Sequence, residues 1–397
     1  MQRSPRILIV GGGIAGLSLG AALVQAGIRP RIIERAPEWA PVGAGIGMGL
    51  NAMLALRAIA AHDEVASRGQ PADFWDLTDH RGRLLLRFDY RAMKAKLGTT
   101  MVCVHRAVLH EVLLARTSGA EVLLGVEPTR LTDTADGVEV SLTDGSCDTY
   151  DLVVGADGIR SAVRDMWFGP ARARYLGYTS RRVVVERPAG IDRVIEMWGP
   201  GRRVGLCPID EQRLYCYTTT NATENAPSPP ETRVDQFRSD FAEFRSVMPG
   251  VLDQIEHPDQ IFHSDLYEVR TETWMRGRVV LIGDAAHAMT PDLGQGGAMA
   301  IEDAISLAEC IASQAEIPAA LGAHLAKRKT RAISMQTRSR RFGRLGQLES
   351  PTLCRCRNAA IRTVASRFVG RLVADKAAHL AVRPALADRT SHRRSPR

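Results

Sequence analysis

Three glycines and one carboxylate near the start of the 397-residue chain have the spacing of a dinucleotide site. Gly11, Gly13 and Gly16 follow the apolar run 7–10 in the order G-x-G-x-x-G, and Glu34 ends the next apolar run. Such glycines permit a tight turn, close approach of the backbone to a pyrophosphate, and close packing of helix on strand. The helix N-terminus attracts phosphate, and the acid can accept hydrogen bonds from ribose hydroxyls. The spacing therefore predicts a dinucleotide-binding strand–helix–strand unit.

Two further acid–glycine motifs follow apolar runs. Asp157 and Gly158 come after the run 151–155, and Asp284 comes after the run 278–282. The glycine-rich segment 291–297 then leads into a helical pattern. Either aspartate could instead cap a helix, but the three motifs in order favour ligand binding.

The elements that must position these motifs alternate between strand and helix, which indicates an α/β fold. We expect strands at 7–10, 30–33, 121–124, 137–142, 151–155 and 278–282, and helices at 15–25, 107–115 and 298–312. Segment 37–48 reads as a loop against a flat ligand, Asn51 as the cap of a helix ending near residue 60, and 74–88 as a hairpin. Residues 170–270 change character and predict a second, sheet-rich domain.

Composition limits the remaining possibilities. Hydrophobic content of 45% and charged content of 24% are typical of a soluble globular protein. The formal net charge of +8 arises mainly from arginines after Lys327. Seven scattered cysteines without a C-x-x-C pair predict reduced thiols, a cytoplasmic location and no metal site. Arg3 and Arg6 imitate a signal peptide, but the ordered glycines that follow argue against cleavage.

Taken together, the glycine fingerprint with Glu34, the Asp157-Gly158 segment and the Gly283-Asp284 segment resemble the class A flavin monooxygenases with the para-hydroxybenzoate hydroxylase fold. The resemblance covers roughly residues 7–312. It implies a Rossmann-like FAD-binding domain of the GR2 type, an inserted sheet-rich substrate domain and a C-terminal helical segment. The expected boundaries are 1–72, 99–168 and 271–325 for the FAD-binding domain, 73–98 and 169–270 for the substrate domain, 326–375 for the helical region, and 376–397 for a disordered tail.

The resemblance also implies residues that would contact FAD, from its adenosine ribose to its pyrimidine edge. They are Gly11, Gly13, Ala15, Gly16, Glu34, Arg35, Gly45, Arg106, Asp157, Gly158, Asp284, Pro291, Gly294, Gly296 and Gly297. A helix N-terminus at Gly296 would stabilise negative charge on reduced flavin without a protein cation. NADH or NADPH would reduce FAD, and O2 would give a C4a-hydroperoxide that hydroxylates an electron-rich ring. The family implies a small-molecule partner, no metal, and a monomer or homodimer.

The substrate is less clearly indicated. The segment 291–297 resembles the loop of FAD-dependent urate hydroxylases and of zeaxanthin epoxidases, which implies catalytic roles for Arg203, Tyr215 and Asp292. Purely structural roles stay open as alternatives: Arg202 and Arg203 in a solvated turn, Tyr215 and Tyr217 in the core, and Asp292 as a helix cap. We expect a small aromatic or heteroaromatic ring, with a purine-like or urate-like ring as one candidate.

Two other functions are compatible with the sequence. The first is epoxidation or hydroxylation of a larger polyketide, terpenoid or carotenoid. The second is nucleic-acid or membrane-surface binding through the basic tail. Ser339, Arg340, Arg341 and Arg344 are read more simply as the polar face of a C-terminal helix packed on the body.

Overall fold

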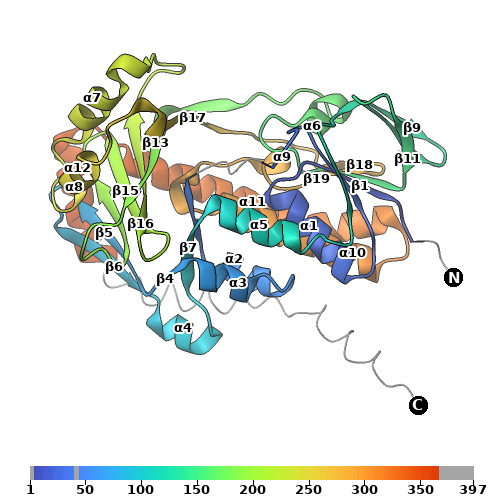
Figure 1. Ribbon diagram of the computed structural model, residues 1–397, viewed down its shortest axis with the longest axis horizontal. Helices are drawn as coiled ribbons and strands as arrows, with labels where there is room; N and C mark the ends of the chain where they lie inside the picture. Colours follow the sequence, from blue (N-terminus) through green and yellow to red (C-terminus); the bar gives the residue numbers. More distant parts are fainter. Residues whose placement is uncertain (1–3, 40–43, 366–397) are drawn as a thin grey trace.

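The computed structural model describes residues 4–39 and 44–365. Gly43 and the predicted tail 376–397 lie outside the described residues. The described chain forms two lobes, one around a mainly parallel sheet and one around a larger, mainly antiparallel sheet, and the long helix α11 (Ile317–Gly346) runs along both (Figure 1).

The first lobe contains a six-stranded sheet in the order β18-β19-β12-β1-β2-β8. Its strands are β18 (Met275–Arg276), β19 (Val279–Leu281), β12 (Leu152–Gly155), β1 (Ile7–Val10), β2 (Arg31–Glu34) and β8 (Glu121–Leu124). All neighbours are parallel except β18, which is antiparallel to β19. Five of the predicted strands are therefore confirmed as neighbours in the parallel part of this sheet.

Both faces of this sheet are buried, which explains the continuous apolar runs. Ile7 and Ile9 pack with the helices α1 (Ile14–Gln25), α5 (Arg106–Ala115) and α10 (Gly296–Ser313). Leu8 and Val10 face the opposite way, toward a three-stranded meander and α6. The meander consists of β9 (Pro128–Thr134), β10 (Gly137–Leu142) and β11 (Cys147–Tyr150), and α6 spans Ala162–Trp167.

The second lobe is a seven-stranded sheet in the order β17-β13-β16-β15-β14-β5-β6. Its strands are β17 (Phe262–Glu268), β13 (Arg174–Glu186), β16 (Arg213–Asn221), β15 (Arg202–Pro208), β14 (Val194–Trp198), β5 (Phe74–Asp79) and β6 (Leu84–Asp89). The last two strands are the predicted hairpin, and β5 joins the sheet parallel to β14.

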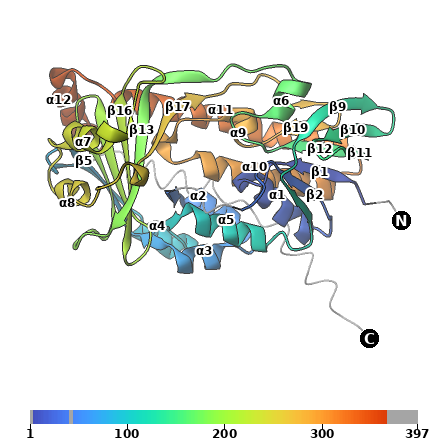
Figure 2. The ribbon, with the colours of Figure 1, turned by 45° about the horizontal axis from the view of Figure 1, so that its top comes forward.

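The two faces of this sheet have different partners, because side chains alternate along each strand. Leu214 and Cys216 pack under the helices α7 (Pro230–Phe241) and α8 (Met248–Leu252), on the outer face (Figure 2). Tyr215 and Tyr217 point the other way, toward the first lobe. The inner face of the sheet is therefore the one available to a substrate site between the lobes.

A small sheet connects the lobes, in the order β3-β7-β4. It consists of β3 (Gly45–Met48), β7 (Met101–His105) and β4 (Gln70–Ala72); the helices α2 (Leu50–Arg57), α3 (His62–Arg68) and α4 (Arg91–Leu97) accompany it. The prediction of a loop was wrong for 45–48, since these residues pair with β7. Asn51 is not a cap: α2 begins after Gly49, and the Asn51 side chain turns inward.

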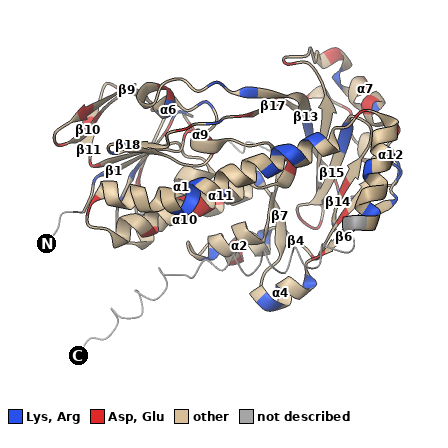
Figure 3. Ribbon diagram, turned by 180° about the vertical axis from the view of Figure 1, so that it is seen from behind, with Lys and Arg blue, Asp and Glu red and all other residues tan. Residues whose placement is uncertain are grey.

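The C-terminal helix is longer and more buried than its arginine content suggests. Helix α11 begins at Ile317, before the predicted start of the helical region, and is followed by α12 (Pro351–Ala360) and a π-helical turn, η3 (Ile361–Ala365). Lys and Arg recur along α11 and α12 (Figure 3). Arg341 and Arg344 are exposed, as expected, but Ser339 is fully buried. The placement of Ser339 on a polar face was wrong, because its hydroxyl bonds to Thr290 of the body. No helix among the described residues is long and apolar enough to cross a membrane.

Candidate functional site: a nucleotide crevice and a buried ionic network

The three predicted nucleotide motifs meet at the carboxyl ends of β1, β12 and β19. Gly11, directly after β1, has φ +109°, and a Cβ there would lie 2.5 Å from the carbonyl oxygen of Ala156, directly after β12. A Cβ on Gly283, after β19, would lie 3.1 Å from the Cβ of Ala15. Side chains at these glycines would push the motifs apart. The sheet therefore assembles, at one edge, segments separated by more than a hundred residues.

Packing within the protein explains why a glycine is needed at some of these positions but not at others. A Cβ on Gly16 would lie 1.9 Å from the oxygen of Gly11, so helix α1 requires this glycine. By contrast, a Cβ on Gly13 or Gly296 would meet no protein atom within 4 Å, and neither residue has a positive φ. Open space at two helix N-termini fits a ligand that lies against the backbone. This is the arrangement that an FAD pyrophosphate at α1 and a flavin edge at α10 require.

Glu34 lies beside the glycine turn. Its Oε2 accepts a hydrogen bond from the amide of Gly12 at 2.7 Å, and its Oε1 accepts one from the amide of Ala36 at 3.0 Å. These bonds fix the half-buried carboxylate next to the first turn of α1, and each oxygen keeps a second lone pair. The predicted ribose contact is compatible with this geometry. Arg35, the next residue, is exposed.

Asp157 has a structural partner and one free oxygen. Its Oδ2 accepts a hydrogen bond from the amide of Val163 at 3.1 Å, so it does support α6, whose N-cap is Ser161. Its Oδ1 is buried without a partner among the described residues. Burial raises the pKa of this carboxyl above its usual value. A buried acceptor left over at the nucleotide edge fits a hydrogen bond to a ligand. Neighbouring Gly158 has φ +81° and open space beyond it.

Asp284 and Arg106 form the next part of the crevice. Asp284 begins the short helix α9 (Asp284–His287), and its exposed carboxylate accepts no hydrogen bond from the described residues. Desolvation by the surrounding protein raises the pKa of this carboxyl, although the positive charges of His287 and Arg106 act to lower it. Arg106, also exposed, begins α5 and donates its amide to Ala44 at 3.0 Å.

The glycine-rich segment after Asp284 forms a short 3-10 turn and then the N-terminus of α10. The turn η2 (Pro291–Leu293) ends at Gly294, which has φ +60°. Ser339 of α11 accepts a hydrogen bond from the Leu293 amide at 3.3 Å. The amides at the start of α10, at Gly296 and Gly297, carry the positive end of an 18-residue helix. This end is suited to stabilising negative charge on a flat ligand.

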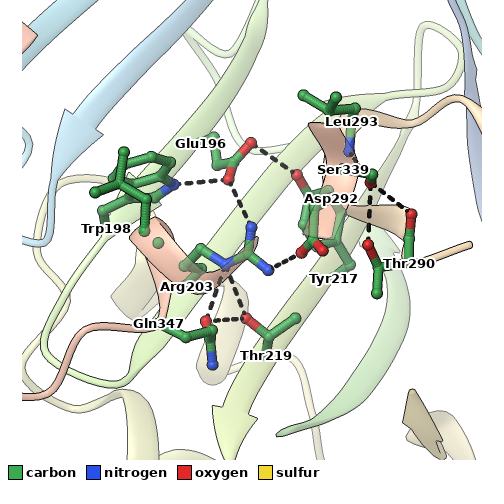
Figure 4. Close-up of polar contacts among 12 residues, drawn as sticks. Glu196, Trp198, Arg203, Tyr217, Thr219, Thr290, Asp292, Leu293, Ser339 and Gln347 are labelled. Atoms are coloured by element: carbon green, nitrogen blue, oxygen red, sulfur yellow. Dashed lines mark hydrogen bonds and ion pairs between the residues drawn. The ribbon is translucent and has the colours of Figure 1, made fainter. Parts of the chain in front are cut away.

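The predicted catalytic residues Arg203 and Asp292 meet in a buried ionic network (Figure 4). Arg203 donates through Nη2 to Asp292 Oδ1, and Tyr178 donates its hydroxyl to Asp292 Oδ2 at 2.6 Å. Glu196 lies on the other side, with its Oε1 3.4 Å from Arg203 Nη1 and its Oε2 accepting from the Tyr217 hydroxyl at 3.2 Å. Two carboxylates therefore surround one guanidinium.

The network excludes two of the purely structural roles considered for these residues. Arg203 is only 1% exposed within β15, so the solvated turn was wrong for this residue. Asp292 uses its oxygens on Arg203 and Tyr178 and makes no capping hydrogen bond, so the helix-cap alternative was also wrong. Arg203 Nε donates to Gln347 at 2.9 Å, which ties the network to the end of α11.

Tyr215 does not belong to this network. Its ring packs against Gly45, where a Cβ would lie 2.5 Å from it, and burial raises the pKa of its hydroxyl. The ring of Tyr217 lies 5.9 Å away. Tyr215 also contributes to a small apolar cluster with Ala44, Ala72, Cys103 and Cys207. It belongs to the apolar wall between β16 and β3.

Sequence reasoning missed a second buried network, beneath the cofactor loop. Glu302 and Asp303 lie in α10 and pair with Arg328 of α11, and Asn51 and His287 join them. The signal was present: a Glu-Asp pair interrupts the apolar helix 298–312. Tyr178 and Glu196 had no comparable signal, because neither stands in a recognisable motif.

A recess of about 490 Å³ lies at the opposite edge of the parallel sheet. Arg29, Arg31, Glu121 and Tyr150 line it, near the amino ends of β2 and β8. Ligands of open α/β sheets bind outside the carboxyl ends of the strands, so this recess is not part of the site.

The fold and the crevice define a flavoprotein. A family model described as "FAD binding domain" matches residues 5–339, and the chain belongs to this family. It is a class A flavin monooxygenase with FAD as its cofactor.

Individual relatives narrow the class. The chain is 39% identical to the aurachin C monooxygenase/isomerase of Stigmatella aurantiaca, over 92% of this chain and 96% of that protein. It is 37% identical to the 2-heptyl-3-hydroxy-4(1H)-quinolone synthase of Pseudomonas aeruginosa, with the same coverage. The solved structure of Klebsiella pneumoniae HpxO with FAD and uric acid superposes with a TM-score of 0.85, at 27% identity, over 93% of this chain and 96% of that one.

Proposed function

We propose that this enzyme uses NADH or NADPH and O2 to hydroxylate a neutral heteroaromatic ring that carries an apolar substituent. FAD, when bound, supplies the redox chemistry. The chain supplies its binding site: Gly13 and Gly296 leave room for close backbone contact, and the exposed Asp284 is free to accept hydrogen bonds from the ribityl hydroxyls. The amides at the start of α10 stabilise negative charge on the reduced cofactor.

The preference for a neutral ring comes from the state of Arg203. Its guanidinium is buried and already faces Asp292 and Glu196, so it offers little positive charge to an anionic substrate. The neighbouring part of the second sheet, by contrast, is apolar, and Tyr215 packs there with Cys103 and Cys207. Such a wall favours apolar contact with a ring and its substituent.

One relative supports this substrate class, and two others point to different heteroaromatic rings. The P. aeruginosa relative is named for a quinolone ring with a heptyl chain, and it matches over nearly its whole length. A urate-like substrate is the second candidate, because of the structural likeness to HpxO with uric acid. A relative from Pseudomonas fluorescens, 31% identical, is a 6-hydroxynicotinate 3-monooxygenase. The quinolone, uric acid and 6-hydroxynicotinate are all heteroaromatic rings, but they differ in charge and in apolar area.

The predicted catalytic trio takes different parts in this proposal. Tyr215 would offer apolar contact to the ring from the cluster that it shares with Cys103 and Cys207. Arg203 and Asp292 join the substrate sheet to the cofactor loop. For Asp292 to accept a substrate proton, it would have to leave Arg203 or Tyr178, since both oxygens are engaged. The domain boundaries, the cytoplasmic location and the oligomeric state stay predictions.

A substrate panel tests the proposal. The FAD-loaded enzyme would be mixed with NADH or NADPH and one of four compounds: 2-heptyl-4(1H)-quinolone, unsubstituted 4(1H)-quinolone, 6-hydroxynicotinate or urate. Nicotinamide oxidation, O2 consumption and a product heavier by one oxygen atom would be followed together. We expect the alkylated quinolone to give the largest coupled rate. A larger rate with urate would overturn the neutral-ring proposal, and no coupled product with any compound would overturn heteroaromatic hydroxylation.

A further inference from the structure

The second buried network contacts both segments that are predicted to hold the flavin. Its centre is Arg328 of α11, which donates through Nε to Asp303 at 2.7 Å and through Nη1 to Glu302. All three side chains are at most 8% exposed. Burial of so many charges is costly unless each is paired, and here the pairing is nearly complete.

One arm of the network reaches the Gly283-Asp284 motif. Asp303 Oδ2 accepts a hydrogen bond from the amide of Gly283 at 3.1 Å and lies 2.6 Å from His287 Nε2. Gly283 has φ +59°, so its amide direction depends on this unusual backbone conformation. Asp303 therefore fixes both ends of α9, the one-turn helix that presents Asp284 to the crevice.

The other arm reaches the start of α10. Asn51 Nδ2 donates to Glu302 Oε1 at 2.7 Å and to Gln295 Oε1 at 2.9 Å. Gln295 is the residue before Gly296 and forms the N-cap position of α10. An amide that is held on one side by a buried carboxylate can hold Gln295 in one orientation. Asn51 is therefore the link between the ionic network and the cofactor loop.

We propose that Asn51 is a positioning residue for FAD, and that it acts by holding Gln295 so that the first amides of α10 keep their direction toward the flavin. The proposal rests on the predicted flavin contact of residues 294–297. It gives Asn51, which touches no reacting atom, a measurable effect on cofactor binding. It also explains why Glu302 occupies a nearly buried position in an otherwise apolar stretch of α10.

The chain offers a matched control. Arg331 also pairs with Glu302, at 2.7 Å, but its side chain is 37% exposed and it reaches neither flavin segment. Arg331→Gln removes the two hydrogen bonds that this partly exposed side chain donates to Glu302, which retains Arg328 and Asn51. Asn51→Ala removes a bond to the same carboxylate and, with it, the contact to Gln295.

The experiment measures FAD release from the holoenzyme at 25 °C, by the rise in flavin fluorescence after dilution, and the urea unfolding midpoint. We expect Asn51→Ala to speed FAD release about tenfold. This is the change in rate that corresponds to the loss of one hydrogen bond to a charged group. Arg331→Gln should change release less than about twofold. Gln295→Ala should speed FAD release by the same factor as Asn51→Ala. The double variant should release FAD no faster than either single variant, because both substitutions remove the same contact between Asn51 and Gln295.

Several outcomes would overturn this inference. Equal release from Asn51→Ala and wild-type protein would do so, as would additive effects in the double variant. A shift in the unfolding midpoint with unchanged release would indicate a merely structural role. If the wild-type protein itself bound no FAD, the proposed function would fail together with this inference. If the wild-type protein bound FAD but Asn51→Ala had no effect, only this inference would fail.

Discussion

Replacing Arg203 with methionine should lower the free energy of unfolding by about 3–5 kcal/mol. Methionine preserves much of the side-chain volume but removes the guanidinium from Asp292 and Glu196. Asp292 would then retain only the Tyr178 hydroxyl at 2.6 Å. Its side chain is 0% exposed, so water cannot take over the lost partner.

The size of this loss follows from the burial. Breaking a buried ion pair on one side leaves an uncompensated charge, whereas an exposed pair contributes at most about 1 kcal/mol. Arg202, the adjacent residue in β15, provides the matched control. Its side chain is 34% exposed, and its ion pairs with Asp240 and Glu243 have N–O distances of 3.7 and 3.5 Å. Arg202→Met should therefore cost less than about 1 kcal/mol.

The assay is urea unfolding at 25 °C, followed by circular dichroism with the same excess of FAD in every sample, since a bound ligand adds to apparent stability. A double variant, Arg203→Met with Asp292→Asn, should recover more than half of the loss, because no ionised Asp292 then remains buried. If Arg203→Met cost no more than Arg202→Met, Arg203 would not form a stabilising buried ion pair with Asp292. If the double variant recovered nothing, the loss would come from packing and not from charge.

Two further predictions concern the cofactor helices and a buried histidine. Gly296→Ala should leave the unfolding free energy unchanged or slightly raised, because its Cβ meets no protein atom, yet it should weaken FAD binding; Gly16→Ala should reduce stability itself, since its Cβ would lie 1.9 Å from the oxygen of Gly11. Flavin fluorescence titration and urea unfolding separate the two effects. Burial lowers the pKa of His324 to about 4, below its ordinary value of about 6.5, so its stabilising contribution is complete above pH 6.5 and is lost as the pH falls toward 4. His324→Gln should remove up to about 3 kcal/mol of that pH dependence, and an unchanged pH profile of urea midpoints would contradict the prediction.

The sequence predicted the nucleotide lobe well, because its signals are local. The strand β1, the helix α1 and the acid that ends β2 follow one another within 28 residues, and the first strand was placed without error. The hairpin of the second lobe was also predicted correctly, from alternation around a turn at Gly82. Asn51 shows the limit of such reasoning. A local cap and a buried link are alike in sequence, and only the position of Glu302 in space distinguishes them.

The partners of the charged side chains were decided by tertiary structure alone. Arg203 and Asp292 are 89 residues apart, and no periodicity or motif relates them. Whether an arginine faces water or two carboxylates depends on which strands and helices close over it, here β15, β14 and α11. The sequence alone determined that the chain binds a dinucleotide at the end of a parallel sheet, because backbone amides and glycines do this through local geometry. The environment of the substrate ring follows from distant residues brought together, since electrostatic energy depends on separation in space and not on separation along the chain.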